Sequence, residues 1–288
     1  MKIIDILISK ESTLSFEFFP PKNKEKEDLL FKTIKKLAKY SPDFASITYS
    51  PTGLSKEKSI MWSKSLKQNF NIEPMMHMTC ITSSKGEVAS IIKQLQHEQI
   101  KNILALRGDI LDEKTFLKNS DFTHAIDLIK YIKSLDDVCI GCAGYPEGHI
   151  ECKKIEEDID YLSKKIDAGA QFIITQLFFD NIHFYNFINL IIKKGINVPV
   201  ICGIMPITSL SQITKFTNIC GATIPKELVK KLYNKSDKDV FDIGIEYTIK
   251  QCIELINNGF KKLHFYTLNN SKSVELILSK LFSMYPYK

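Results

Sequence analysis

The feature that most constrains this chain is one pattern that recurs along its whole length. A short run of β-branched or aromatic residues is followed by a polar turn and then by a longer stretch with helical periodicity. The short runs predict eight strands, at residues 14–19, 44–49, 74–80, 102–106, 138–143, 172–176, 198–204 and 263–267. The longer stretches predict helices at residues 24–39, 55–69, 84–97, 121–134, 154–168, 181–194, 208–219 and 271–283. Strand and helix therefore alternate from end to end.

Eight strands that alternate with helices predict an α/β fold whose parallel sheet closes into a (β/α)8 TIM barrel. An extra helical insertion is expected between strands seven and eight, at residues 225–235 and 240–258. No proline-rich or serine-rich linker divides the chain, so residues 1–288 are expected to form a single domain. An open doubly wound sheet is the alternative. It is disfavoured because the sequence has neither a G-x-G-x-x-G motif after the first strand nor a G-x-x-x-x-G-K-[ST] motif.

Charge and cysteine usage argue against several classes of protein. The chain has 39 lysines and arginines against 33 acidic residues, and Arg107 is the single arginine. Because the lysines alternate with acidic residues and lack the planar fork of arginine, nucleic-acid binding is not expected. No apolar run approaches the length of a membrane span, and residues 1–10 show no cleavage site of a secreted protein. Seven cysteines, mostly in apolar segments, favour buried thiols in a cytoplasmic protein.

Polar residues gather after the predicted strands, and the active site of a parallel barrel lies at the carboxyl ends of its strands. Glu17 is the clearest candidate, because aromatic residues flank it within the first strand. Desolvation keeps a carboxyl protonated at higher pH and makes it a usable proton donor near neutral pH. Arg107, Gly108 and Asp109 follow the fourth strand, where the glycine lets the backbone approach a ligand closely. Further candidates are Thr48, Tyr49, His77, Thr79, Tyr145, Glu147, His149, Gln176, Gln212, Tyr266 and Asn269.

Each of these residues also has a purely structural interpretation. Glu17 would then pair with a lysine, Arg107 would pair with the adjacent Asp109, and His77 would be an ordinary core histidine. Lysines are absent from the strand ends, which disfavours a Schiff-base aldolase, and no H-x-H pair or acidic cluster predicts a metal site. Carboxylates at the strand ends would permit glycoside hydrolysis, but the single tryptophan, Trp62, lies in a predicted helix.

Nine short motifs, in this order, resemble methylenetetrahydrofolate reductase of the bacterial type, from about residue 14 to residue 283. They are Ser15-Phe-Glu-Phe-Phe-Pro-Pro21, Ser46-Ile-Thr-Tyr49, His77-Met-Thr-Cys80, Ala105-Leu-Arg-Gly-Asp109, Tyr145-Pro-Glu147, Asp167-Ala-Gly-Ala170, Ile174-Thr-Gln176 with Phe178-Phe-Asp180, Gly203-Ile-Met-Pro206 and His264-Phe-Tyr-Thr-Leu-Asn269. The resemblance implies a barrel that binds FAD noncovalently and passes a hydride from NADH or NADPH, in ping-pong order, to 5,10-methylenetetrahydrofolate. The product would be 5-methyltetrahydrofolate, a methyl source for methionine synthesis. The resemblance implies the catalytic barrel alone, so the C-terminal regulatory domain of eukaryotic relatives is not expected.

The resemblance assigns catalysis to two carboxylates. Glu17 matches the general acid that protonates the departing nitrogen when the methylene bridge of the folate opens. Asp109 matches the carboxylate that holds the pterin and stabilises the cationic intermediate. Gln176 matches a residue that contacts both nicotinamide and pterin, and Gln212 and Phe216 match folate contacts.

The same resemblance places a larger set of residues around FAD or the nicotinamide. They are Thr48, Tyr49, His77, Arg107, Gly108, Asp109, Ala125, Tyr145, His149, Asp158, Lys164 and Lys165. Three positions depart from the family pattern: Lys164 and Asn270 stand where arginine is common, and Tyr161 stands where asparagine is common.

The partners that the resemblance implies are small-molecule substrates, with no nucleic acid and no membrane, and a homo-oligomer is expected. Two alternatives stay open. One is another FAD-dependent barrel oxidoreductase such as proline dehydrogenase, and the other is a flavin-binding barrel without catalysis. A carboxylate-based hydrolase would differ from all of these because it would bind no chromophore.

Overall fold

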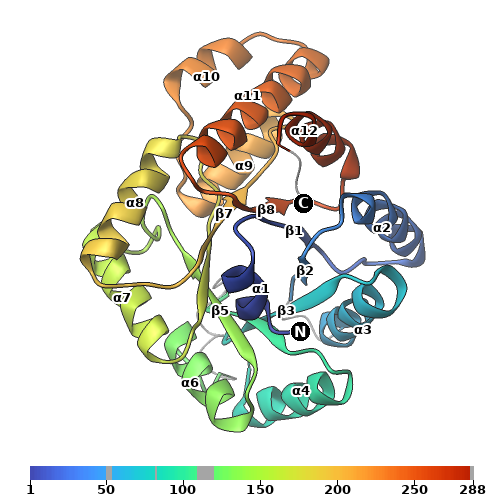
Figure 1. The fold of residues 1–288 in the computed structure, drawn as a ribbon, viewed down its shortest axis with the longest axis vertical. Helices are drawn as coiled ribbons and strands as arrows, with labels where there is room; N and C mark the ends of the chain where they lie inside the picture. The colour runs from blue at the N-terminus through green and yellow to red at the C-terminus, as the bar shows by residue number, and fades with distance from the viewer. Residues whose placement is uncertain (50–53, 82, 109–119, 286–288) are drawn as a thin grey trace.

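The computed structural model describes residues 1–49, 54–81, 83–108 and 120–285, without the side chains of 54–56. In these residues, eight parallel strands follow one another around a closed barrel, and the last strand pairs with the first (Figure 1). The strands are β1 (Thr13–Phe18), β2 (Phe44–Ile47), β3 (Glu73–Thr79), β4 (Asn102–Leu106), β5 (Cys139–Gly144), β6 (Phe172–Thr175), β7 (Val200–Ile204) and β8 (Lys262–Tyr266). The predicted (β/α)8 TIM barrel is confirmed.

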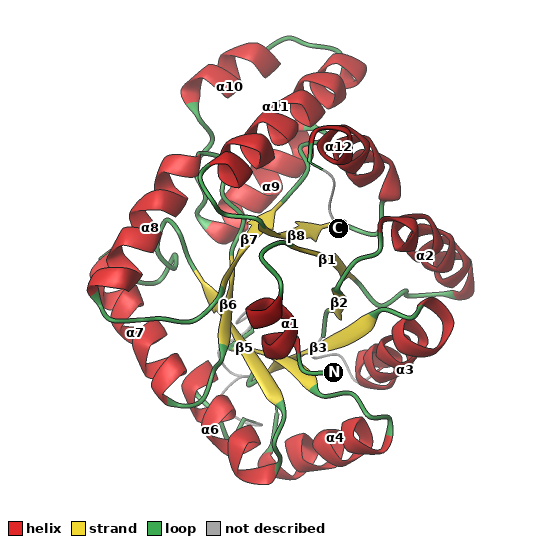
Figure 2. Cartoon of the chain, in the orientation of Figure 1, coloured by secondary structure: helices red, strands yellow, loops and turns green. Residues whose placement is uncertain are grey.

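Helices surround the barrel on its outer face (Figure 2). They are α2 (Lys24–Leu37), α3 (Leu54–Phe70), α4 (Lys85–His97), α6 (Ala125–Leu135), α7 (Ile155–Asp167), α8 (Asn181–Lys193), α9 (Leu210–Cys220), α10 (Lys226–Leu232), α11 (Asp237–Asn257) and α12 (Ser271–Met284). A short 3-10 turn, η1 (Ala38–Tyr40), extends α2. The expected insertion between β7 and β8 is present as α10 and α11, and the predicted helices agree with the observed ones to within a few residues.

One helix, α1 (Ile3–Ser9), was not predicted. It lies across the amino-terminal end of the barrel, near the centre of the view in Figure 1. Its Ile3 and Leu7 are buried against side chains that point into the barrel, among them Phe44, Met75 and Phe172. Seven residues are too few to show a helical period, so the amphipathic pattern of this segment gave no signal.

The interior of the barrel changes character along its axis. The half next to α1 is apolar, and Leu104 and Ile174 of this apolar cluster also line the cavity at the opposite end. They therefore form part of the floor of the cavity. Above this floor the buried interior is polar, with Glu17, His77 and His264. The polar chemistry thus lies at the carboxyl ends of the strands, as expected for this fold.

Asn102 joins α1 to the barrel through four hydrogen bonds. Its Oδ1 accepts from the backbone N–H of Ile3 at 2.7 Å, and its Nδ2 lies 3.0–3.2 Å from oxygens of Met1, Glu73 and Pro74. The side chain is fully buried. Its loss would therefore leave several buried polar groups without partners.

We expect Asn102→Leu to lower the free energy of unfolding by about 2–4 kcal/mol, because buried polar groups that lose their partners are costly. Urea unfolding followed by circular dichroism measures the change. Asn69→Leu is the matched control, since Asn69 is exposed on α3 and its amide contacts Ser65 one turn away. The control should stay within about 0.5 kcal/mol of the unsubstituted chain. Equal effects of the two substitutions would contradict the anchoring role.

Two other sequence expectations concern cysteines and membranes. All seven cysteines are free, and Cys80, Cys139, Cys142, Cys202 and Cys252 are buried, so the expectation of buried thiols is confirmed for most of them. Within the described ranges, none of the helices combines the length and the apolar character that a membrane crossing requires.

Candidate active site

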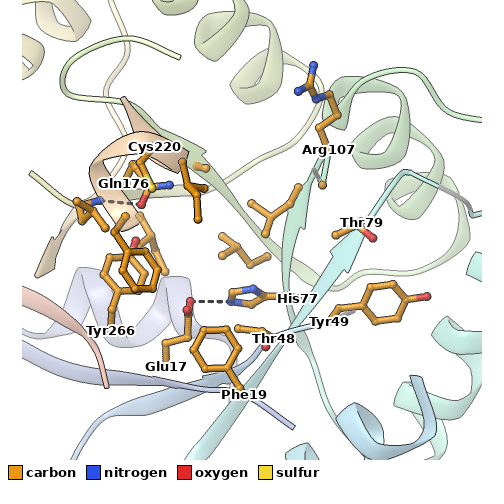
Figure 3. Close-up of a pocket in the computed structure, with 18 of the residues that line it drawn as sticks. Glu17, Phe19, Thr48, Tyr49, His77, Thr79, Arg107, Gln176, Cys220 and Tyr266 are labelled. Carbon is orange, nitrogen blue, oxygen red and sulfur yellow. Dashed lines mark hydrogen bonds and ion pairs between the residues drawn. The ribbon is translucent and has the colours of Figure 1, made fainter. Parts of the chain in front are cut away.

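A cavity of about 990 Å³ opens at the carboxyl ends of the strands (Figure 3). Side chains from most of the strands, from the loops that follow them and from α9 line it. Twelve residues singled out from the sequence meet there: Glu17, Thr48, Tyr49, His77, Thr79, Arg107, Gly108, Tyr145, His149, Gln176, Phe216 and Tyr266. The volume is at the upper end of the range for small-molecule sites, so the cavity suits a large ligand or two smaller ones.

Glu17 points into the barrel because side chains alternate along β1. Phe16 and Phe18, its neighbours in sequence, point the other way and pack in the layer between the strands and the helices, with Leu30 and Ile34. Glu17 is 8% exposed, so its expected burial is confirmed. The burial comes from the barrel interior, however, and not from the two flanking phenyl rings.

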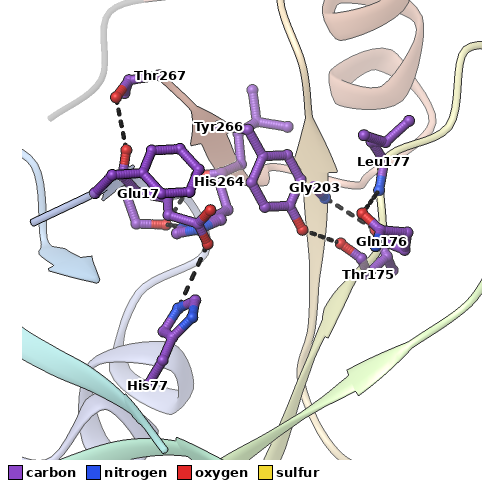
Figure 4. Close-up of polar contacts among 12 residues, drawn as sticks. Glu17, His77, Thr175, Gln176, Leu177, Gly203, His264, Tyr266 and Thr267 are labelled. Atoms are coloured by element: carbon purple, nitrogen blue, oxygen red, sulfur yellow. Dashed lines mark hydrogen bonds and ion pairs between the residues drawn. The ribbon is translucent and has the colours of Figure 1, made fainter. Parts of the chain in front are cut away.

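The carboxyl of Glu17 faces two imidazoles. Its Oε2 lies 3.4 Å from Nε2 of His77 and 3.8 Å from Nε2 of His264 (Figures 3 and 4). Burial lowers the pKa of His77 below its usual 6.5; the Glu17 charge opposes this and His264 adds to it. At neutral pH the His77 contact is therefore a carboxyl beside an uncharged ring, and not an ion pair. The lysine partner of the structural interpretation is not found among the described contacts of Glu17.

Tyr266 closes the side of the cavity next to Glu17. Its hydroxyl donates to the carbonyl of Thr175 at 2.6 Å, and the backbone N–H of Gly203 donates to Thr175 Oγ1 at 2.9 Å (Figure 4). Burial raises the pKa of Tyr266 well above its usual value, with the Glu17 charge adding to the effect, so the phenol stays neutral. Gly203 allows the Tyr266 ring to lie close to the backbone of β7, because a Cβ at this position would lie 2.8 Å from the ring.

The loop after β8 is fastened to the end of β1. Thr267 Oγ1 donates to the carbonyl of Glu17 at 2.6 Å. The Asn269 side chain accepts from the N–H of Phe19 and donates to its carbonyl, both at 2.9 Å. These contacts hold the backbone of the Glu17 segment in place and account for two polar positions of the 264–269 motif.

Arg107 lies at the border between the main cavity and a second cavity of about 210 Å³. Its guanidinium makes a bidentate contact with Glu151, at 2.6 and 2.7 Å. The hydrogen bond from Arg107 lowers the pKa of Glu151, so this pair stays charged. Asp109, the partner that the sequence suggested for Arg107, lies outside the described residues. Gly108 has φ +89°, and a Cβ there would lie 3.1 Å from the Thr79 side chain.

The second cavity holds three further residues named from the sequence: Ala125, Asp158 and Lys165. Burial raises the pKa of Asp158, and the charge of Lys165 opposes the rise. Lys165 donates to the carbonyl of Ala143 at 3.0 Å. His124 and Tyr161 also line this cavity, with their rings nearly parallel and their centroids 6.2 Å apart.

Four of the sequence candidates line neither cavity: Glu147, Lys164, Gln212 and Asn269. Glu147 accepts from the N–H and hydroxyl of Thr223, at 3.1 and 2.6 Å. Gln212 accepts from the N–H and hydroxyl of Thr208, at 2.8 and 2.7 Å, and donates to the carbonyl of Pro206. Lys164 lies with its Nζ 5.0 Å from the centre of the Tyr161 ring. The roles that the resemblance gave to Gln212 and Lys164 stay predictions.

Sequence reasoning gave no role to several residues of the site. Thr79 and Tyr266 were noted as strand-end residues only, and His264 was not a candidate. All three follow from the two-residue period of a strand: Thr79 lies on the same face as His77, and His264 on the same face as Tyr266. Cys220, at the end of α9, lines the cavity and had no comparable signal.

Comparison with known proteins decides the family. The model of the family described as methylenetetrahydrofolate reductase matches residues 2–282. The chain belongs to the methylenetetrahydrofolate reductase family. The 5,10-methylenetetrahydrofolate reductase of Buchnera aphidicola subsp. Acyrthosiphon pisum is 36% identical over 263 residues, which cover 89% of this chain and 87% of the relative.

Longer relatives match over part of their length. Methylenetetrahydrofolate reductase 1 of Schizosaccharomyces pombe is 34% identical over 291 residues, or 98% of this chain and 48% of the yeast protein. The chain thus spans about half the length of such relatives. Among solved structures, an uncharacterized protein from Clostridium thermocellum that binds two copies of 5-methyl-5,6,7,8-tetrahydrofolic acid has a TM-score of 0.72 at 15% identity, covering 98% of both chains. At this identity the similarity shows the fold alone.

The departures from the methylenetetrahydrofolate reductase pattern have defined contacts in this structure. Asn270 is the N-cap of α12, and its side chain accepts from the N–H of Lys272 at 3.0 Å. Tyr161 stacks with His124 at the second cavity. Asn270 is therefore engaged with the backbone of its own helix, whereas Tyr161, which is 42% exposed, presents a ring to the cavity.

Proposed function

We propose that this chain reduces 5,10-methylenetetrahydrofolate to 5-methyltetrahydrofolate with NAD(P)H, using noncovalently bound FAD in a ping-pong sequence. The observation that carries the proposal is the buried Glu17 carboxyl, which faces the imidazoles of His77 and His264 at the base of a cavity large enough for a cofactor and a substrate. Membership of the methylenetetrahydrofolate reductase family supports the choice of substrate. The product would carry a methyl group for methionine synthesis, and the enzyme would act on small molecules alone.

The residues present fit FAD. The main cavity and the second cavity share Arg107, Tyr145 and His149, so together they suit an extended ligand. Thr79 Oγ1 lines the main cavity, is buried and has no hydrogen-bond partner among the described residues, as expected for a group that meets a ligand. The residues that would hold FAD are Thr48, Tyr49, His77, Arg107, Gly108, Tyr145, His149, Ala125, Asp158 and Lys165.

When bound, FAD would carry the hydride from NAD(P)H to the folate. The chain would supply binding and a proton. Glu17 would donate its proton to the departing nitrogen of the folate bridge. The side chains of His77 and Tyr266 beside it are uncharged at neutral pH. Gln176 Oε1 accepts from the N–H of Leu177 at 2.9 Å, which leaves its amide N–H groups to donate to a substrate carbonyl. Phe216 would offer its ring to the aminobenzoyl group, and Asp109 keeps its predicted electrostatic role.

Spectroscopy and half-reactions test the proposal. The purified protein, supplied with FAD, should show a flavin absorption spectrum that NADH bleaches in the absence of oxygen. Addition of methylenetetrahydrofolate should then restore the oxidised spectrum. A protein that takes up no FAD would exclude this function, and bleaching without reoxidation by folate would leave only a flavin-binding barrel without this catalysis.

Arg107→Lys should weaken flavin retention several-fold. A lysine cannot reproduce the bidentate contact with Glu151 that orients the cation at the border of the two cavities. Flavin fluorescence after dilution measures the fraction retained. Lys130→Ala on the exposed face of α6 is the control and should change nothing. If Arg107→Lys left the affinity for flavin unchanged, the role of Arg107 would be limited to its ion pair with Glu151.

A further inference from the structure

A chain of buried polar side chains runs from Ser15 through His264 to Glu17. The Oγ of Ser15 lies 2.8 Å from Nδ1 of His264, and its hydroxyl donates to the carbonyl of Leu263 at 3.2 Å. His264 is fully buried, and its Nε2 lies 3.8 Å from Glu17 Oε2 (Figure 4). The His264 ring stacks on Phe44 at 6.1 Å, so packing holds it in this orientation.

The hydrogen bonds of Ser15 favour one tautomer of His264. Because the Ser15 hydroxyl donates to Leu263, its oxygen is free to accept from Nδ1–H of His264. The reverse arrangement, in which the hydroxyl donates to Nδ1, gives up the bond to Leu263. A neutral imidazole with Nδ1–H has a bare Nε2, and this Nε2 has no hydrogen-bond partner among the described residues. A lone pair therefore faces the Glu17 carboxyl.

We propose that Ser15 and His264 are positioning residues that hold Glu17 in its protonated form, ready to act as the acid. At 3.8 Å the bare ring nitrogen attracts the proton of a neutral carboxyl and repels a carboxylate. This inference rests on the proposed function, because it concerns Glu17 as the proton donor in the reduction of the folate.

The other groups around Glu17 bring no opposing charge to it. His77 from β3 is also neutral and lies 3.4 Å from the carboxyl, but no described contact fixes its tautomer as Ser15 does for His264, and Tyr266 from β8 directs its hydroxyl to Thr175. Ser46 lies beside Glu17 on β2 and carries no charge. The cations that line the same cavity are Lys22, Lys58 and Arg107, and none of them has a described contact with Glu17.

Ser15→Ala tests the inference. The substitution removes the acceptor of Nδ1–H, so the ring can take the Nε2–H tautomer, which donates to Glu17 and stabilises the carboxylate. The alkaline limit of folate reduction should then move about one pH unit lower, where one unit corresponds to about 1.4 kcal/mol. Flavin reduction by NADH should keep its pH profile. His264→Gln replaces the bare Nε2 with an amide whose N–H can donate to Glu17, so it should shift the alkaline limit in the same direction. This variant replaces Ser15→Ala as the test if Ser15→Ala does not fold.

Ser46→Ala is the matched control, because Ser46 is equally buried, is adjacent in register and has no described partner for its Oγ. Its pH profile should be that of the unsubstituted chain. Nitrogen-15 NMR of the cofactor-free protein reads the His264 tautomer directly and should show Nδ1–H, changing to Nε2–H in Ser15→Ala. An unshifted alkaline limit in both variants, or Nε2–H in the unsubstituted protein, would overturn the inference. Absence of folate reduction by the unsubstituted protein would instead overturn the proposed function, and the inference with it.

Discussion

Glu17→Gln is expected to slow folate reduction by about 10²- to 10⁴-fold while flavin reduction by NADH stays within about twofold, because only the folate step needs a proton donor. Glutamine has nearly the same shape as glutamic acid but cannot transfer a proton. The side chain of Glu17 makes contacts of 3.4 and 3.8 Å with imidazole nitrogens, and the neutral amide of glutamine can take the place of a neutral carboxyl there. The cavity should therefore keep its form, and the two half-reactions should separate.

Anaerobic stopped-flow absorbance measures each half-reaction of this variant by itself. The control is Glu11→Gln, at a surface carboxylate whose side chain is 81% exposed and pairs with Lys261. The control should match the unsubstituted chain in both steps. Equal loss of both steps in Glu17→Gln would show a role in cofactor binding or folding, and an unchanged folate step would exclude Glu17 as the acid.

The barrel could be predicted from the sequence because its signals are local. Each strand and helix has its own hydrophobic period, and eight alternating units leave few topologies for a chain of this length. α1 was missed because it owes its position to tertiary contacts: Ile3 and Leu7 bury against the barrel, and Asn102 ties the helix to β3 and β4. No local pattern in seven residues carries that information.

The candidate site was predictable only in part, for the same reason. The two-residue period of β1 places Glu17 in the interior, but His77 comes from β3 and His264 from β8, and only closure of the barrel brings these side chains to Glu17. The partner of Arg107 shows the limit most clearly. Sequence adjacency suggested Asp109, whereas the structure places Glu151, 44 residues away, against the guanidinium. Contacts of this kind depend on register and loop geometry, which a single sequence does not encode locally.

Among the described glycines, Gly203 is the one where an added methyl group is expected to lower the free energy of unfolding most. A Cβ at this position of β7 would lie 2.1 Å from the carbonyl oxygen of Thr175 and 2.8 Å from the ring and hydroxyl of Tyr266. The first of these atoms belongs to the backbone of β6, so it cannot move without disturbing the β6–β7 pairing. Because overpacking against backbone has no cheap relaxation, the free energy of unfolding should fall by about 3 kcal/mol or more. Displacement of Tyr266 should also lower the flavin content of the purified protein.

Chemical denaturation and the ratio of flavin to protein absorbance measure the two effects of Gly203→Ala. Gly86→Ala is the matched control, because its added Cβ would meet nothing nearer than 4.0 Å and lies in α4. A glycine within a helix costs about 0.5–1 kcal/mol relative to alanine, so the control should be neutral or more stable. Adding Tyr266→Phe to Gly203→Ala removes the hydroxyl contact but leaves the contact with Thr175, so the double variant should recover stability only in part. If Gly203→Ala lowered the free energy of unfolding by less than about 1 kcal/mol, β7 would have to be able to shift. The side of the cavity between Glu17 and Gln176 would then tolerate a side chain at position 203.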